Sequence, residues 1–203
     1  MNAGTHWEAV YRSKAPDAVS WYRPHLERSL DLIERAANNR SASIIDAGAG
    51  ESTLADDLLR RGYTDITVLD ISPTALEVMQ ERLGQAAAHM HWICGDITRV
   101  SLPQACFDVW HDRAVFHFLT APEDRAGYVQ SVLHSVRRGG NVIVSAFGPE
   151  GPARCSGLDV MRYDATALHG QFGRSFRLIE SSTELHFTPW GSAQQFVYCY
   201  CRV

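Results

Sequence analysis

The sequence predicts an α/β protein with a doubly wound, seven-stranded, mostly parallel sheet, helices on both faces and a C-terminal antiparallel hairpin. Between residues 41 and 147, strand-like runs alternate with helix-like segments. Strands that are separated by helical crossovers form parallel sheets. The last third instead holds two β-rich runs with no helix between them, at 176–187 and 195–203, which we expect to pair as the hairpin.

The individual elements follow from short apolar runs and from helix boundary signals. Leucines after residue 53 recur at helical spacing and stop at Gly62, which suits a helix C-terminus. Ser72 has the position of an N-cap, with Pro73 as the first helical residue. In chain order we expect strands at 43–47, 66–69, 91–94, 107–111 and 141–147, and helices at 53–61, 73–83 and 123–138.

The final run has apolar residues on both of its faces. Phe196, Tyr198 and Tyr200 alternate with Val197 and the two cysteines that follow it. A strand with two apolar faces is buried on both sides, so we expect it inside the sheet rather than at an edge.

The first forty residues stand apart from this α/β core, which begins at residue 41. Leu26, Leu30, Ile33 and Ala37 share one helical face and predict a helix. The segment before it carries large aromatic residues that either pack this helix onto the sheet or form a lid over a ligand. They are Trp7, Tyr11, Trp21 and Tyr22. We expect residues 1–203 to form one domain, with 1–40 as a helical lid segment and 41–203 as the core.

Composition excludes several classes of protein. The net charge of −4 gives no overall basic field for binding nucleic acid. No run approaches the ~18 apolar residues of a membrane span, and the polar N-terminus does not resemble a signal peptide. The five cysteines are odd in number and form no C-x-x-C pair, so we expect neither a disulfide framework nor a metal site, and a cytoplasmic location.

The strongest functional signal is the turn after the first strand. Asp46 precedes Gly48, Ala49 and Gly50, and a helix follows directly. Glycines allow a tight turn and let a ligand lie against the backbone, close to the helix N-terminus. The sequence therefore predicts a nucleotide or nucleoside site at this turn.

Two further acids follow neighbouring strands and sharpen this prediction. Asp70, with Ile71 beside it, ends the second strand, where a carboxylate can accept both hydroxyls of a ribose. Asp96 and Ile97 follow the third strand, where the acid can accept a bond from an adenine amino group and the isoleucine can pack on the ring.

The type of cofactor depends on the residues around the glycines. A nicotinamide site has a third glycine, in G-x-G-x-x-G, where this chain has Thr53. Asp46, two residues before Gly48, suits a ligand that carries an ammonium group and no pyrophosphate. We therefore expect S-adenosylmethionine rather than a nicotinamide dinucleotide.

In these motifs the sequence resembles the class I S-adenosylmethionine-dependent methyltransferases, which have a Rossmann-like fold. The turn matches the family's first motif, Asp70 its ribose acid and residues 95–97 its adenine motif, over roughly residues 41–147. Residues 137–140 match the family's L-x-P-G-G turn, with Arg138 in place of the proline. Glu51 and Ser52 replace a further glycine of many members, which alters the turn but keeps the motif.

The N-terminus is similar to a subgroup that includes protein-lysine methyltransferases. The similarity rests on the pattern H-W-E-x-x-Y at residues 6–11 and on V-S-W-Y at 19–22. It implies that Trp7, Tyr11 and Trp21 close over the methionine end of the cofactor.

Candidate catalytic residues follow the fourth strand, because ligands bind at the carboxyl ends of such strands. His111 is a candidate contact of the cofactor's methionine moiety, and so is Asp112. Arg113 either clamps an anion of the substrate or pairs with Asp112. His117 is either the general base or a packed structural residue.

Two later residues are candidates for binding the methyl acceptor. Cys155 lies in a loop rich in glycine and proline, beside Arg154, as a recognition group or as a tolerated loop cysteine. Trp190 lies at the turn of the hairpin, where it either walls a pocket or covers the sheet.

The acceptor itself is left open by the sequence. We expect methyl transfer to a small molecule, with a protein lysine as the alternative and a non-catalytic cofactor-binding subunit as a third possibility. The residues after the fourth strand, H-D-R-A, differ from the Asn/Asp-Pro-Pro-Tyr/Phe motif of base N-methyltransferases, so nucleic acid is not expected as a partner. We expect no membrane partner either.

Overall fold

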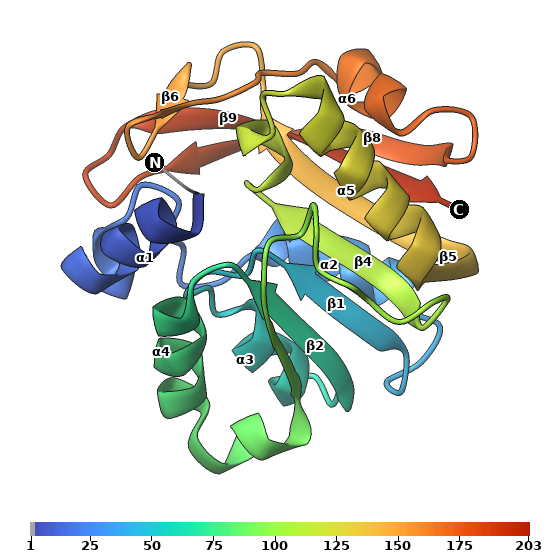
Figure 1. Ribbon diagram of the computed structural model, residues 1–203, viewed down its shortest axis with the longest axis horizontal. Coiled ribbons are helices and arrows are strands. Elements are labelled where there is room, and N and C mark those ends of the chain that lie inside the picture. Colours follow the sequence, from blue (N-terminus) through green and yellow to red (C-terminus); the bar gives the residue numbers. More distant parts are fainter. Residues whose placement is uncertain (1–2) are drawn as a thin grey trace.

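The computed structural model describes residues 3–203 and confirms the predicted fold class (Figure 1). Within this range, seven strands form one sheet in the order β3-β2-β1-β4-β5-β9-β8. The first five strands run parallel, and β9 pairs antiparallel with both β5 and β8. The strands are β1 (Ser43–Ala47), β2 (Asp65–Asp70), β3 (His91–Cys94), β4 (Phe107–Arg113), β5 (Val136–Phe147), β8 (Arg177–Phe187) and β9 (Ala193–Arg202).

Helices cover both faces of the sheet, as expected (Figure 1). One apolar cluster joins α2, α3 and α4 to one face, and a second cluster joins α5 and α6 to the other. The helices are α1 (Ala3–Ser13), α2 (Glu27–Ala36), α3 (Leu54–Arg60), α4 (Pro73–Leu83), α5 (Pro122–Ser135) and α6 (Ala165–Phe172), with short 3₁₀ turns η1 (Pro16–Ala18), η2 (Gly84–His89) and η3 (Phe116–Phe118).

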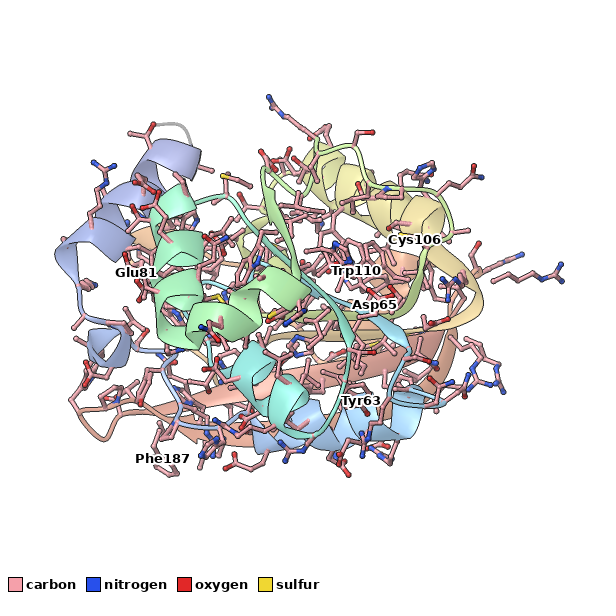
Figure 2. All side chains as sticks on the ribbon, turned by 90° about the horizontal axis from the view of Figure 1, so that it is seen from below. Tyr63, Asp65, Glu81, Cys106, Trp110 and Phe187 are labelled. Carbon is pink, nitrogen blue, oxygen red and sulfur yellow. The ribbon has the colours of Figure 1, made fainter. Side chains whose placement is uncertain are left out.

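Strand β9 lies inside the sheet, which confirms the prediction from its two apolar faces. Phe196 and Tyr198 pack in the cluster with α2, whereas Val197 and Cys199 pack in the cluster with α5 and α6. The edge strand β8 is more exposed: Phe187 retains 59% of its accessible surface and lies at the margin of the molecule in Figure 2.

The structure differs from the expectation at several boundaries and contains elements that were not expected. Strand β4 continues to Arg113, so Asp112 and Arg113 belong to the strand rather than following it. Helix α5 ends at Ser135 and β5 begins at Val136, because this residue pairs with Phe107 ahead of an irregularity in the β4–β5 register. Helix α6 and the small hairpin of β6 (Arg154–Cys155) and β7 (Leu158–Asp159) were not expected. Helix α6 nevertheless begins after a residue type that is preferred at helix N-caps. This residue is Asp164, whose side chain accepts a bond from the backbone N–H of Ala167.

The N-terminal helix α1 is attached to α4 (Figure 1). The carboxylate of Glu8 accepts bonds from the hydroxyls of Ser72 and Thr74, both at 2.6 Å, and from the backbone N–H of Thr74. These bonds lower the pKa of Glu8 to about 2. The N-terminal segment is thereby held next to the carboxyl ends of the parallel strands.

No helix within residues 3–203 combines the length and the apolar character needed to cross a membrane.

Candidate active site

The turn between β1 and α3 has the backbone geometry that its glycines predict. Gly48 and Gly50 have φ angles of +71° and +56°, in the left-handed region that favours glycine. A Cβ atom at Gly48 would overlap the side chain of Val115, so this close approach also requires glycine. The backbone N–H groups of Gly48 and Ala49 donate to the carbonyl of Leu69, which ties the turn to the end of β2.

Asp70 joins the same turn to the start of α4. Its Oδ2 accepts a bond from the N–H of Gly50 and its Oδ1 one from the N–H of Ser72, both at 2.8 Å. Burial raises the pKa of Asp70 to about 6 despite these bonds. Each carboxylate oxygen has a second lone pair, so the backbone bonds leave capacity for two ligand hydroxyls.

A cavity of about 740 Å³ lies between the N-terminal segment and the carboxyl ends of the parallel strands. This volume is in the range of ~300–1,000 Å³ that is usual for small-molecule and cofactor sites. Among the predicted site residues, the cavity wall includes Trp7, Tyr11, Trp21, Asp46, Gly48, Ala49, Asp70, Ile71, Asp96, Ile97, His111, Arg113 and Cys155. Gly50 is covered by the hydroxyl end of Tyr11.

Three buried acids lie close together at the wall of this cavity. Oδ2 of Asp46 and both carboxylate oxygens of Glu51 are buried without a hydrogen-bond partner in the described structure, and Asp70 lies beside them. Burial raises the pKa of Glu51 to about 7. Buried acids without a hydrogen-bond partner are costly, and a cationic ligand would relieve that cost. These residues therefore fit a cofactor that carries positive charge.

Glu51 is a site residue that was not predicted from the sequence. An acidic residue directly after Gly50, inside a turn that packs closely, was the feature that could have identified it.

Asp46 belongs to a continuous chain of buried hydrogen bonds. His111 Nδ1 lies 2.8 Å from Asp46 Oδ1, and His111 Nε2 lies 2.8 Å from Ser29 Oγ. Ser29 Oγ lies 3.3 Å from the hydroxyl of Tyr198, which donates to Glu184. The chain fixes one carboxylate oxygen of Asp46 and leaves the other turned to the cavity. It also engages both ring nitrogens of His111, so this histidine holds Asp46 in place.

Aromatic side chains from the N-terminal segment form one wall of the cavity. The ring of Trp7 lies 4.8 Å from Phe118, 5.8 Å from Trp21 and 6.1 Å from Tyr11, measured between centroids. Because Phe118 belongs to η3, the contact with Trp7 connects α1 to the segment after β4. Burial, together with Asp70 and Glu51 nearby, raises the pKa of Tyr11 above its ordinary value, so its hydroxyl stays neutral.

Arg113 and Asp112 do not pair, because consecutive residues of a strand point to opposite faces. Arg113 turns toward the cavity, and its Nη1 donates to the carbonyl of Trp21 at 3.2 Å. Asp112 turns toward α5, where it accepts bonds from the hydroxyl of Tyr128 and the N–H of Val115. Burial raises the pKa of Asp112 to about 6.

His117 and Trp190 are not brought to the cavity wall. His117 is fully buried, and its ring stacks on the ring of Phe147 with 4.3 Å between the centroids. The backbone N–H of Phe147 donates to His117 Nδ1 at 3.2 Å. Burial and the nearby Arg113 lower the pKa of His117 to about 3, so it is a neutral and very weak base. Trp190 is 61% exposed at the end of the β8–β9 hairpin. These positions favour structural or surface roles for both.

Cys155 lies on β6 and lines the cavity. Its thiol is 7% exposed and lies 3.9 Å from the hydroxyl of Ser20. Burial raises the pKa of Cys155, so the thiol is neutral rather than a thiolate.

Residues 44–140 match a family model described as a methyltransferase domain. The chain is 30% identical over 144 residues to the eEF1A lysine and N-terminal methyltransferase homolog of Drosophila melanogaster, which covers 68% of this chain and 21% of that protein. It is also 30% identical over 148 residues to the 2-heptyl-1-hydroxyquinolin-4(1H)-one methyltransferase of Mycobacteroides abscessus, covering 70% of this chain and 63% of that protein. The chain thus spans about a fifth of the length of the first of these relatives.

Among solved structures, one from work on the conversion of a disulfide bond into a thioacetal group during echinomycin biosynthesis aligns with a TM-score of 0.81. The alignment covers 99% of this chain and 92% of that one at 17% identity, so it supports the fold.

Proposed function

The chain belongs to the class I S-adenosylmethionine-dependent methyltransferase family, and from this premise we propose that it transfers a methyl group to a small-molecule acceptor. The observation that carries the proposal is the cavity wall, which combines three neighbouring buried acids with aromatic side chains and Arg113. This combination suits a cationic cofactor and an acceptor bound in one cavity.

The buried acids and the glycine turn between β1 and α3 are assigned to the cofactor. Asp70 accepts the ribose hydroxyls, Asp46 receives the ammonium group on Oδ2, and Gly48 with Ala49 allows close approach of the backbone. Asp96 and Ile97, also on the cavity wall, are assigned to the adenine. S-adenosylmethionine supplies an electrophilic methyl group, whose bond to sulfur breaks as the acceptor's lone pair forms the new bond.

The protein's main task in such a reaction is alignment and exclusion of water. The aromatic wall of Trp7, Tyr11, Trp21 and Phe118 performs both, because it closes the cavity on the side of the N-terminal segment. We therefore assign residues 1–40 to a lid and the whole of 1–203 to one methyltransferase domain. The cytoplasmic location expected from the cysteines is part of the same proposal.

One relative is named for a small-molecule acceptor, as proposed here, whereas others are named for protein acceptors. The mycobacterial relative is named for a small heterocyclic acceptor, whereas the insect relative is named for lysine and N-terminal methylation. A protein acceptor is therefore the second candidate. A cavity with an aromatic wall and a partly buried arginine suits a molecule that enters as a whole better than an extended lysine side chain.

The test is incubation with methyl-labelled S-adenosylmethionine, separately with panels of thiols, carboxylic acids, phenols and amines and with cell-lysate proteins. We expect S-adenosylhomocysteine and label in a small-molecule fraction. Label in protein alone would favour the second candidate. Binding of the cofactor without turnover on any acceptor would favour a non-catalytic subunit.

A further inference from the structure

The cavity wall contains a partly buried cation, Arg113, without a counter-ion among the described residues. Nε and Nη2 of Arg113 are buried and make no hydrogen bond within residues 3–203, and in that range the side chain has no carboxylate at ion-pair distance. Nη1 donates to the carbonyl of Trp21, and the guanidinium also interacts with the neutral hydroxyl of Tyr198. The guanidinium carbon lies 4.4 Å from the centroid of the Phe196 ring, which supports it from one side.

The groups around Arg113 do not supply the missing negative charge. His117 and His186 lie near it, and burial lowers the pKa of both, which keeps them neutral. Burial raises the pKa of Tyr198, which keeps that hydroxyl neutral too. Glu184, an acid close to Tyr198, is already paired with Arg23 and accepts a bond from the Tyr198 hydroxyl.

A partly buried guanidinium without an anionic partner is costly for a folded protein. Nε and Nη2 lie on the same edge of the group, which is the edge that binds a carboxylate with two parallel hydrogen bonds. In Arg113 neither atom of this edge has a carboxylate partner within residues 3–203, and the residue lines the cavity. An anionic ligand would supply that partner.

We propose that the acceptor is a planar, largely apolar molecule with one anionic group, which Nε and Nη2 of Arg113 bind. The anion can be a carboxylate or an ionised oxygen or sulfur, because each accepts from the same edge. The apolar body is assigned to the rings of Trp7, Trp21, Phe118 and Phe147, which line the same cavity. This inference rests on the proposed function and names the acceptor class of the same site.

The probe pair is indole-3-acetate and its neutral counterpart indole-3-acetamide, which share one flat ring system. Their affinities are measured by calorimetry in the presence of saturating S-adenosylhomocysteine. We expect the wild-type protein to bind the carboxylate at least tenfold more tightly than the amide. Arg113→Gln should remove this preference and leave the affinity for S-adenosylhomocysteine within threefold of wild type.

Arg23→Gln is the matched control, because Arg23 also lines the cavity but already has Glu184 as its partner. It should keep the tenfold preference. A second variant, Arg113→Met, separates binding from folding: removing a partly buried charge that has no anionic partner should leave the melting temperature unchanged or raise it. A clear drop would show that Arg113 is a structural residue and would overturn the proposal.

The other contrary results are equally specific. Equal or undetectable binding of the two probes by the wild-type protein, or a preference that survives in Arg113→Gln, overturns the anionic acceptor. A tenfold loss of S-adenosylhomocysteine affinity in Arg113→Gln would assign the guanidinium to the carboxylate of the cofactor instead. Failure of the wild-type protein to bind S-adenosylhomocysteine at all would instead refute the proposed function itself.

Discussion

Binding of S-adenosylmethionine should release protons, because two of the acids at its site are partly protonated in the free protein near neutral pH. Burial raises the pKa of Glu51 from 4.5 to about 7 and that of Asp70 from 3.8 to about 6. A cationic ligand favours the charged form of each acid, so binding lowers both pKa values. Affinity therefore rises with pH up to about 7 and levels off above it.

The size of the effect follows from these pKa values. If binding returns each acid to its ordinary pKa, protonation of Glu51 weakens the affinity about 20-fold between pH 7.5 and pH 5.5. Protonation of Asp70 contributes about a further fourfold. At pH 6 binding should release roughly one to one and a half protons.

The assay is calorimetry at pH 5.5, 6.0 and 7.5 in two buffers with different ionisation enthalpies, which counts the protons directly. Glu51→Gln should remove most of the pH dependence. Glu81→Gln is the control, since Glu81 is exposed on α4 (Figure 2), and it should behave as wild type. An affinity that is constant from pH 5.5 to 7.5, with the same heat in both buffers, would refute the assignment of these acids to the cofactor.

Three further variants test single parts of the site. Asp70→Ala should lower cofactor affinity at least tenfold, because two charge-assisted bonds of about 1.5–3 kcal/mol each are lost; calorimetry on the folded variant checks this, and unchanged affinity would place Asp70 outside the site. Ser29→Ala leaves Nε2 of the buried His111 unpaired and should cost about 1–3 kcal/mol, or about 2–4 °C of melting temperature per kcal/mol, with weaker cofactor binding; an unaltered melting curve would contradict the hydrogen-bond chain. His117→Ala should cost at least about 2 kcal/mol of stability while turnover per folded molecule is kept, because the ring packs on Phe147 and is neutral; a fall in kcat of about 10²–10⁴ would instead support the general-base role.

The parts of the molecule that were predictable from the sequence depend on local rules. Strand β1 and the cap of α4 were located to the residue, because a short apolar run and a Ser-Pro pair act over a few positions. The position of β9 inside the sheet followed from the apolar residues on both of its faces. The glycine turn was predictable for the same reason, since only glycine adopts its left-handed conformation without strain.

The parts that were not predictable depend on contacts between distant residues. The bond from Ser29 to His111 joins positions 82 residues apart, and no local pattern marks this serine. Glu51 was visible as a departure from the family motif, but its burial depends on packing around the turn. The separation of Asp112 from Arg113 was within reach, because the two-residue period of a strand already assigns them to opposite faces.

The most direct test of the cofactor assignments is a crystal structure of the protein with S-adenosylhomocysteine bound. We predict the ribose hydroxyls on Asp70, the ammonium group within hydrogen-bond distance of Asp46 Oδ2, and the sulfur facing the compartment lined by Trp21 and Arg113. The free edge of Arg113 should stay available in that complex. A ligand in the reverse orientation, with its adenine beside Arg113 and no contact to Asp46 or Asp70, would contradict the roles assigned to these residues.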